Sequence, residues 1–191
     1  MKLILDFDDT LSNNKPLKEA MYSCLEEVGI PRNVSEKFYN EKRSTSKPFS
    51  LKDFLRSIFA NENIEGPVDA VYEKIMEICP NLLDQRLLDI VKKLGKENCY
   101  IVTNGDFDYQ MDKIKRSNIE TLFSRIIVVP GSKKEAIEKI CTDNKDERII
   151  FVDNKPEFFA DLDMSVCKNL TTILYDENSL ERLKIIYRQN L

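Results

Sequence analysis

A short apolar strand that ends in a run of acids constrains this chain more than any other feature. Residues 3–5 are Leu-Ile-Leu, and Asp6, Asp8, Asp9 and Thr10 follow at once. Alternate side chains of an extended segment share a side, so Asp6 and Asp8 point the same way. Carboxylates this close repel one another unless a cation or a proton offsets the charge. The run indicates a metal-assisted nucleophilic site, whereas a turn or helix cap is the structural alternative.

A second apolar strand, residues 99–102, ends in a hydroxyl and a turn. Thr103, Asn104, Gly105 and Asp106 follow it. A hydroxyl beside a turn-prone Asn-Gly pair offers an O–H and backbone N–H groups to an anion. Asp106 also suits the N-cap of a following helix, and an ordinary loop fits the same residues.

A third apolar strand, residues 148–152, again ends in an acid, Asp153. Strands separated by helical stretches are typical of a parallel α/β sheet, in which ligands bind beyond the carboxyl ends of the strands. We therefore expect an α/β fold with a doubly wound, Rossmann-like parallel sheet. Asp6, Thr103 and Asp153 should meet in one crevice of that sheet.

A helix start between these strands carries two lysines. Ser132 and Glu135 form a capping box, which predicts a helix beginning here. Lys133 and Lys134 would then lie at the positive end of the helix, an unfavourable place unless an anion holds them. Two solvated lysines on a surface helix are the alternative.

The first motif resembles that of the haloacid dehalogenase-like (HAD) superfamily, which has Asp-x-Asp-x-Thr after an apolar strand. Asp6, Asp8 and Thr10 fill it without a departure. The resemblance implies that Asp6 attacks phosphorus and becomes an aspartyl-phosphate, while Asp8 protonates the leaving oxygen and later deprotonates water. This role requires surroundings that raise the pKa of Asp8. Dehalogenase and phosphonatase branches typically lack the second Asp, so Asp8 argues against them.

The second and third motifs of the superfamily imply the phosphate contacts. Thr103, with Asn104 beside it, would bind the transferring phosphoryl group. A lysine at the helix start would contact the phosphate and the nucleophile. We choose Lys133 over Lys134 because the local pattern Lys-x-Glu-x-Ile suits it.

The fourth motif implies a magnesium site. Its ligands would be Asp6, Asp8 through its carbonyl, and Asp153. Many members carry a second Asp where this chain has Asn154, an uncharged oxygen ligand that would hold Mg²⁺ less tightly. Glu157 is either a compensating acid or a favourable charge in a first helical turn.

The long gap between the first two strands predicts an insertion, because a direct crossover needs far fewer residues. We expect a core of residues 1–11 and 87–191 and a mobile α-helical cap of residues 12–86. The polar stretch 41–47 in the cap is a solvated connector or a loop whose cations meet a phosphorylated substrate, and the connector is favoured. Apolar positions at helical spacing predict helices in the cap, at Leu17, Met21, Leu25 and Val28, at Phe54, Leu55, Ile58 and Phe59, and at Val68, Val71, Tyr72, Ile75 and Met76. The same spacing predicts helices of the core at Leu87, Leu88, Val91 and Leu94 and at Leu180, Leu183, Ile186 and Tyr187. Residues 171–175 are predicted to form the last strand.

Composition narrows the chemistry. The 191 residues include no histidine, which excludes Ser-His-Asp hydrolysis and His-containing zinc hydrolase motifs. Five scattered cysteines are expected to be apolar core residues in a reducing compartment. A net charge of −4 without a basic stripe argues against nucleic acid. With no apparent leader and no apolar run of membrane-spanning length, a cytoplasmic protein with no membrane partner is expected, as a monomer or weak homodimer.

The predicted function is Mg²⁺-dependent hydrolysis of a small-molecule phosphate monoester through an aspartyl-phosphate. A phosphomutase of the same superfamily would use the same residues and return the phosphoryl group to its substrate. A non-catalytic module that binds a phospho-ligand or a protein on this fold is a third possibility.

Overall fold

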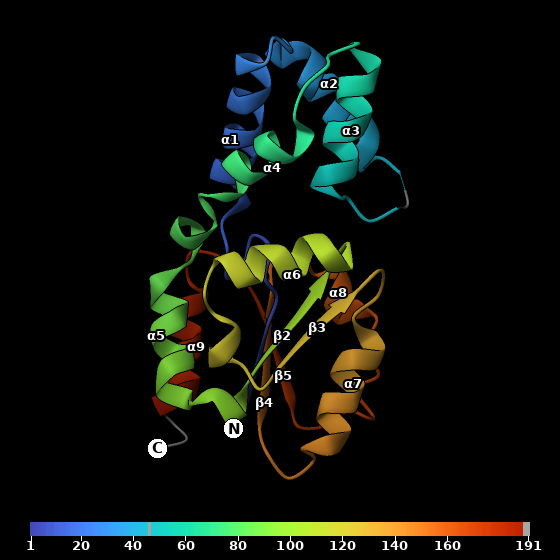
Figure 1. The fold of residues 1–191 in the computed structure, drawn as a ribbon. Helices are drawn as coiled ribbons and strands as arrows, with labels where there is room; N and C mark the ends of the chain where they lie inside the picture. The colour runs from blue at the N-terminus through green and yellow to red at the C-terminus, as the bar shows by residue number, and fades with distance from the viewer. Residues whose placement is uncertain (46, 189–191) are drawn as a thin grey trace.

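The structure is a computed structural model that describes residues 1–45 and 47–188, with side chains to residue 186. It has two bodies, one stacked on the other (Figure 1). Ser46, in the predicted polar stretch, and the side chain of Tyr187, in the predicted last helix, lie outside the described part.

The lower body contains a five-stranded parallel sheet with the order β3-β2-β1-β4-β5. The apolar runs of the sequence form four of these strands. The strand bounds are β1 Lys2–Leu5, β2 Cys99–Asn104, β3 Arg125–Val129, β4 Ile149–Asp153 and β5 Leu170–Leu174. Strand β3 was not predicted, and it is an edge strand whose residues are exposed or only half-buried.

Helices cover both faces of the sheet, which confirms the predicted α/β fold class. One face packs against α5, α6 and α9, and the other packs against α7 and the segment around α8. Successive residues of β1 alternate between the faces, as a strand requires: Leu3 and Leu5 join the first cluster and Ile4 joins the second. The helices and 3₁₀ turns of this body are α5 Gln85–Leu94, η2 Lys96–Asn98, α6 Phe107–Arg116, η3 Glu120–Leu122, α7 Lys134–Asp143, α8 Glu157–Ala160 and α9 Ser179–Arg188.

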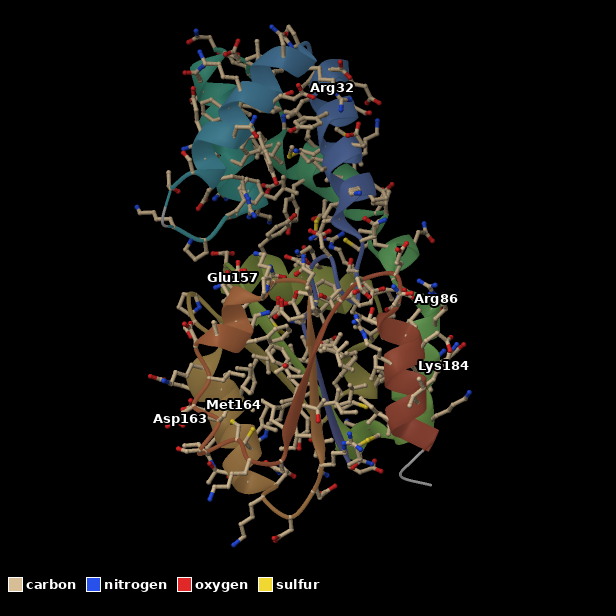
Figure 2. All side chains as sticks on the ribbon, turned by 180° about the vertical axis from the view of Figure 1, so that it is seen from behind. Arg32, Arg86, Glu157, Asp163, Met164 and Lys184 are labelled. Carbon is tan, nitrogen blue, oxygen red and sulfur yellow. The ribbon has the colours of Figure 1, made fainter. Side chains whose placement is uncertain are left out.

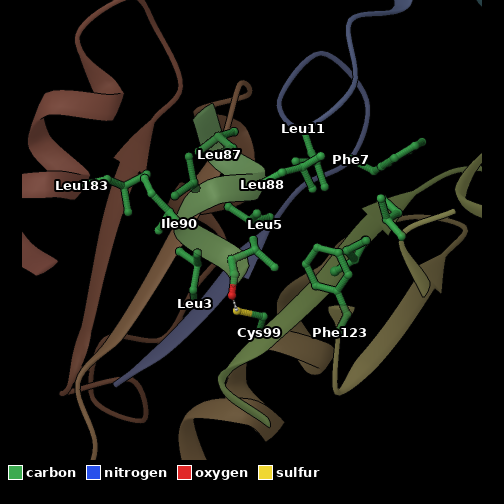
Figure 3. Close-up of a cluster of buried hydrophobic side chains, with 14 of the residues drawn as sticks. Leu3, Leu5, Phe7, Leu11, Leu87, Leu88, Ile90, Cys99, Phe123 and Leu183 are labelled. Carbon is green, nitrogen blue, oxygen red and sulfur yellow. Dashed lines mark hydrogen bonds between the residues drawn. The ribbon is translucent and has the colours of Figure 1, made fainter. Parts of the chain in front are cut away.

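The first of these clusters joins the sheet to α5 (Figure 3). Leu3 and Leu5 of β1 pack with Leu87 of α5, and all three are fully buried. The Cys99 thiol lies 3.7 Å from the carbonyl oxygen of Val91. All five cysteines are free and buried, which confirms that they are core residues.

The upper body is a helical cap with its own apolar core, and α1, α3 and α4 each bury one apolar stripe in it. Ser50 caps α3 by accepting from the Asp53 N–H. Helix α2 was not predicted, because its Val34, Phe38 and Tyr39 are only partly buried among many polar residues. It also takes up the first part of the predicted polar stretch. The cap elements are α1 Asn14–Glu27, α2 Arg32–Arg43, α3 Leu51–Asn61, α4 Val68–Met76 and η1 Cys79–Leu82.

Two antiparallel connections join the cap to the core. Ser12 forms a bridge with Leu83, and the Asn13 N–H donates to the Leu82 carbonyl at 2.9 Å. Helix α5 then begins at Gln85, one residue before the predicted end of the cap at residue 86. The chain therefore leaves and re-enters the core side by side.

A polar contact away from these connections also links the two bodies. The Tyr72 hydroxyl of α4 donates to Asp112 of α6 at 2.6 Å, and Arg116 pairs with Glu73 at 2.8 Å. The cap is therefore held against α6 as well as at its two connections.

Asp84 at the start of α5 gives a stability prediction. It accepts from the N–H groups of Arg86 and Leu87 and from the Tyr175 hydroxyl at 2.7 Å. Burial opposes its charge, but Arg86 and Tyr175 outweigh burial and lower the pKa of Asp84 to about 2. A lowered pKa stabilises the fold above the ordinary value of 3.8, and this contribution is lost as the pH falls through about 2. Asp84→Asn should cost about 1–2 kcal/mol at neutral pH.

Urea unfolding across acidic pH would test this. Asparagine is itself a good N-cap, so the comparison isolates the charge. The two proteins should converge in stability as the pH approaches the lowered pKa. A difference in the free energy of unfolding that persists at that pH would contradict the lowered pKa of Asp84.

Within the described ranges, no helix combines the length and apolar character needed to cross a bilayer.

Candidate active site

Asp6 and Asp153 lie side by side at the carboxyl ends of two adjacent strands. Asp6 follows β1 and Asp153 ends β4, and the Asp6 N–H donates to the Val152 carbonyl at 2.9 Å. Both carboxylates are almost fully buried. The parallel register of β1 and β4 thus brings together two acids that are far apart in the sequence.

Lys133 lies between these two carboxylates. Its Nζ is 2.6 Å from Asp6 Oδ1 and 2.6 Å from Asp153 Oδ2, and its side chain is 1% exposed. The ring of Phe158 covers the ammonium at 4.3 Å from the ring centroid. Lys134, in contrast, is solvent-exposed and faces Glu138. Of the two lysines, Lys133 is the one that reaches the acids.

The start of α7 differs from the predicted capping box. The helix begins at Lys134 with Lys133 as its N-cap, and Ser132 is one position too early. The Ser132 hydroxyl instead donates to Asp161 and accepts from the Lys134 N–H. Because Lys133 stands at the cap position, its side chain can turn inward to the acids.

The Asp6 carboxyl has an unusual proton affinity. Burial raises its pKa, Lys133 lowers it and Asp153 raises it, and the result is a pKa of about 6. Thr10 closes the loop by donating its hydroxyl to Asp6 Oδ2 at 3.3 Å. The Lys133 ammonium is thus paired with two buried carboxylates, so the group of Lys133, Asp6 and Asp153 has a net negative charge when both acids are ionised.

Asp8 has partners that the sequence did not reveal. The buried Lys113 of α6 forms an ion pair with Asp8, and Gln110 donates to the same carboxylate at 2.7 Å. Burial opposes the charge on Asp8, but Lys113 and Gln110 outweigh it, and the pKa of Asp8 is lowered. The expectation of surroundings that raise this pKa is therefore wrong.

Lys113 and Gln110 could not be identified from the sequence. They stand three positions apart on one face of α6, and Lys113 is 105 residues from its partner. Gly105 packs beside them, where a Cβ would lie 2.5 Å from the Gln110 amide nitrogen. Glycine at this turn therefore leaves room for Gln110 to reach Asp8.

Thr103 and Asn104 end β2 beside Asp6. Thr103 is fully buried, and its hydroxyl has no hydrogen-bond partner among the described groups. An unpartnered buried hydroxyl suits a ligand that supplies the missing partner. Asn104 was predicted to bind phosphate. Its side-chain amide donates to the carbonyls of Val129 and Gly131 and so holds the loop after β3.

The oxygen ligands near Asp6 fit Mg²⁺ in their chemistry. Asp6 and Asp153 supply two adjacent carboxylates, and the buried Asn154 Oδ1 has no hydrogen-bond partner among the described groups. No cluster of three or more His, Cys, Asp or Glu suited to a metal occurs in the described part of the chain. The Asp8 carboxylate is paired with Lys113. Of the Asp8 oxygens, this leaves the backbone carbonyl, as predicted, to join Asp6 and Asp153 as a metal ligand.

Asp6, Asp8 and Lys133 line a cavity of about 1280 Å³ between the two bodies. Asp6 and Lys133 lie on the core side, and Tyr39 and Phe49 of the cap also line it. Figure 2 shows the two bodies from behind, with Arg86, another lining residue, near the end of the core that faces the cap.

Solved structures share this architecture. A structure described as a haloacid dehalogenase-like hydrolase from Burkholderia xenovorans has a TM-score of 0.68 and 16% identity, over 93% of this chain and 86% of that chain. A 2-haloacid dehalogenase from Pseudomonas syringae has a TM-score of 0.60 and 16% identity over 100% of both chains. The chain has the haloacid dehalogenase-like fold.

The same HAD-like fold occurs in a Bacillus subtilis protein described as the HAD-hydrolase YfnB, solved bound to magnesium. Its TM-score is 0.55 at 16% identity, over 97% of both chains. No protein-family model and no curated protein sequence matches the chain. The comparisons therefore establish the HAD-like fold, and the chemistry must be argued from the side chains.

Proposed function

We propose that this chain is a HAD superfamily phosphatase that hydrolyses a small-molecule phosphate monoester with Mg²⁺ through an aspartyl-phosphate. The observation that carries the proposal is the buried Asp6 carboxylate, which borders a large cavity and lies against Lys133 and beside Asp153. Five free cysteines support the further proposal of a cytoplasmic location.

In the first step, an Asp6 oxygen forms a bond to phosphorus while the ester P–O bond breaks. Lys133 and the unpartnered Thr103 hydroxyl bind the phosphoryl oxygens, on which charge is concentrated. Asp8 gives a proton to the leaving alkoxide. Since the pKa of Asp8 is lowered while Lys113 holds it, this proton transfer requires Lys113 to turn from Asp8 to the anionic substrate.

In the second step, water attacks phosphorus and the Asp6–phosphorus bond breaks, which releases inorganic phosphate. Asp8 accepts the proton of the water, and its ionised form suits this role. Magnesium, when bound by Asp6, Asp153 and the Asp8 carbonyl, supplies positive charge to the phosphoryl group.

Release of phosphate from p-nitrophenyl phosphate tests the proposal. We expect turnover with Mg²⁺ and a loss of about a hundredfold or more after chelation. Product analysis separates hydrolysis from a phosphomutase, which would return the group to its substrate. The fold is shared with a dehalogenase, so release of chloride from a 2-chloro acid is the matched negative assay. Chloride release without phosphate release would reject the proposal.

A further inference from the structure

The charged side chains that the cap helices and their loops contribute to the cavity wall are all positive. Lys15, Lys18, Arg43 and Lys47 line the cavity from the cap. Among the described residues, no carboxylate of the cap elements α1 to η1 lines it, and Asp84 lines it from the start of α5, where it is paired with Arg86. Arg43 and Lys47 belong to the polar stretch that the sequence singled out. The whole chain has a net charge of −4, so a wall of cations is not an average property of its surface.

The cap cations differ in their partners from Lys113 and Lys133, whereas the core cation Lys155, which also lines the cavity, is likewise in none of the ion pairs found among the described residues. Lys133 and Lys113 are already paired with carboxylates of the core. None of the ion pairs found among the described residues includes Lys15, Lys18, Arg43 or Lys47. The cap therefore presents to the cavity four cations that form no close ion pair with a carboxylate of the described residues.

Two of these cations are oriented by aromatic rings. Lys18 Nζ lies 4.7 Å from the Tyr39 ring centroid, and the Arg43 guanidinium lies 5.9 Å from that of Phe49. Such contacts hold a cation in place without cancelling its charge. Lys15 and Lys18 also stand at the start of the fourteen-residue helix α1. Its own first turn has no acid, and the Asp9 carboxylate accepts from the Asn14 N–H at this end.

The wall between the two sets of cations is aromatic. The Tyr39 and Phe49 rings are 5.2 Å apart, and Phe49 is 6.0 Å from Tyr109 on α6. A phosphate alone would fill little of a cavity of about 1280 Å³, so the body of the ligand must extend from Asp6 past these rings.

Resting on the proposed function, we infer that the substrate is a phosphate monoester with a second anionic group, which Lys18 and Arg43 bind at the cap. The scissile phosphate lies at Asp6, an uncharged body lies along Tyr39 and Phe49, and a carboxylate or second phosphate meets the cap cations. The cap thus selects the substrate by the charge at its far end.

Turnover of ω-phosphooxyalkanoic acids of increasing chain length, compared with their primary amides, tests this inference. The acid and its amide share leaving-group chemistry and differ in one charge. At the best chain length we expect the KM of the acid to be about tenfold below that of the amide. Alkanediol bisphosphates are the third set of substrates. A comparison of their KM with that of the acids shows whether the second anion is a phosphate or a carboxylate.

Lys18→Gln and Arg43→Gln should each reduce the preference for the acid by about threefold. Lys37→Gln is the matched control, because Lys37 is an exposed cation of α2 outside the cavity wall, and it should keep the full preference. Turnover of acid and amide with equal KM, or a preference that survives both cavity variants, would overturn the inference.

Calorimetry with the corresponding phosphonates separates this inference from the proposed function, because phosphonate binding needs no turnover. Tighter binding of the acid phosphonate than of its amide, lost in Arg43→Gln, would support the second anion site even if no phosphate were released. Equal binding of the two phosphonates would reject it.

Discussion

Asp6→Asn should reduce phosphate release about a thousandfold or more while the protein stays folded. The amide oxygen is a poor nucleophile, so the aspartyl-phosphate cannot form. The loss should appear in kcat with every phosphate monoester that the wild type hydrolyses. Steady-state kinetics with saturating Mg²⁺ measures it.

The same variant should be more stable than the wild type at neutral pH. The pKa of Asp6 is raised to about 6, so its favourable neutral form is fully present below 3.8 and is lost as the pH rises through about 6. The amide of the variant does not ionise, and Lys133 keeps Asp153 as its partner. The gain should be about 2 kcal/mol above pH 6 and should vanish toward pH 4. Stability and activity therefore change in opposite directions, which excludes unfolding as the cause of inactivity.

Asp9→Asn is the control within the same motif. Asp9 is exposed, has a positive φ of 58° that asparagine tolerates, and accepts from the Asn14 N–H at 3.0 Å. We expect it to keep most of the activity. Equal losses in Asp9→Asn and Asp6→Asn, or an active Asp6→Asn, would refute the assignment of the nucleophile.

The sequence predicts most of the sheet because buried parallel strands are continuous apolar runs. It also predicts that acids at the ends of such strands lie at one edge, and Asp6 and Asp153 do. Strand β3 and helix α2 are not predicted from the sequence, because their residues are exposed or only partly buried and their apolar patterns are therefore weak.

The polar part of the site is less predictable because it depends on side-chain direction. Lys113 has the sequence context of a surface lysine, and only the packing of α6 turns it to Asp8. Lys133 and Lys134 differ only by the residue at which α7 begins. A shift of one residue rotates a helical side chain by about a quarter turn, which decides between the cavity and solvent.

Lys133→Met should destabilise the protein by about 3 kcal/mol in the absence of divalent cations. It would leave Asp6 and Asp153, which are 4% and 0% exposed, beside each other without the ammonium between them. Mg²⁺ should restore much of this loss, because a ligand that binds only the folded state stabilises it by mass action. Phosphate release should also fall by about a hundredfold or more, since Lys133 binds the phosphoryl oxygens.

Urea unfolding with chelator and with Mg²⁺ measures both effects. Lys134→Met is the matched control, because Lys134 is exposed and its Glu138 pair is long at 3.8 Å, so its change should stay below about 0.5 kcal/mol. Mg²⁺ should stabilise Lys133→Met more than the wild type, in which the ammonium competes for the same carboxylates. Equal stabilisation of all three proteins would place the metal elsewhere, and no stabilisation of any would reject a magnesium site at Asp6 and Asp153.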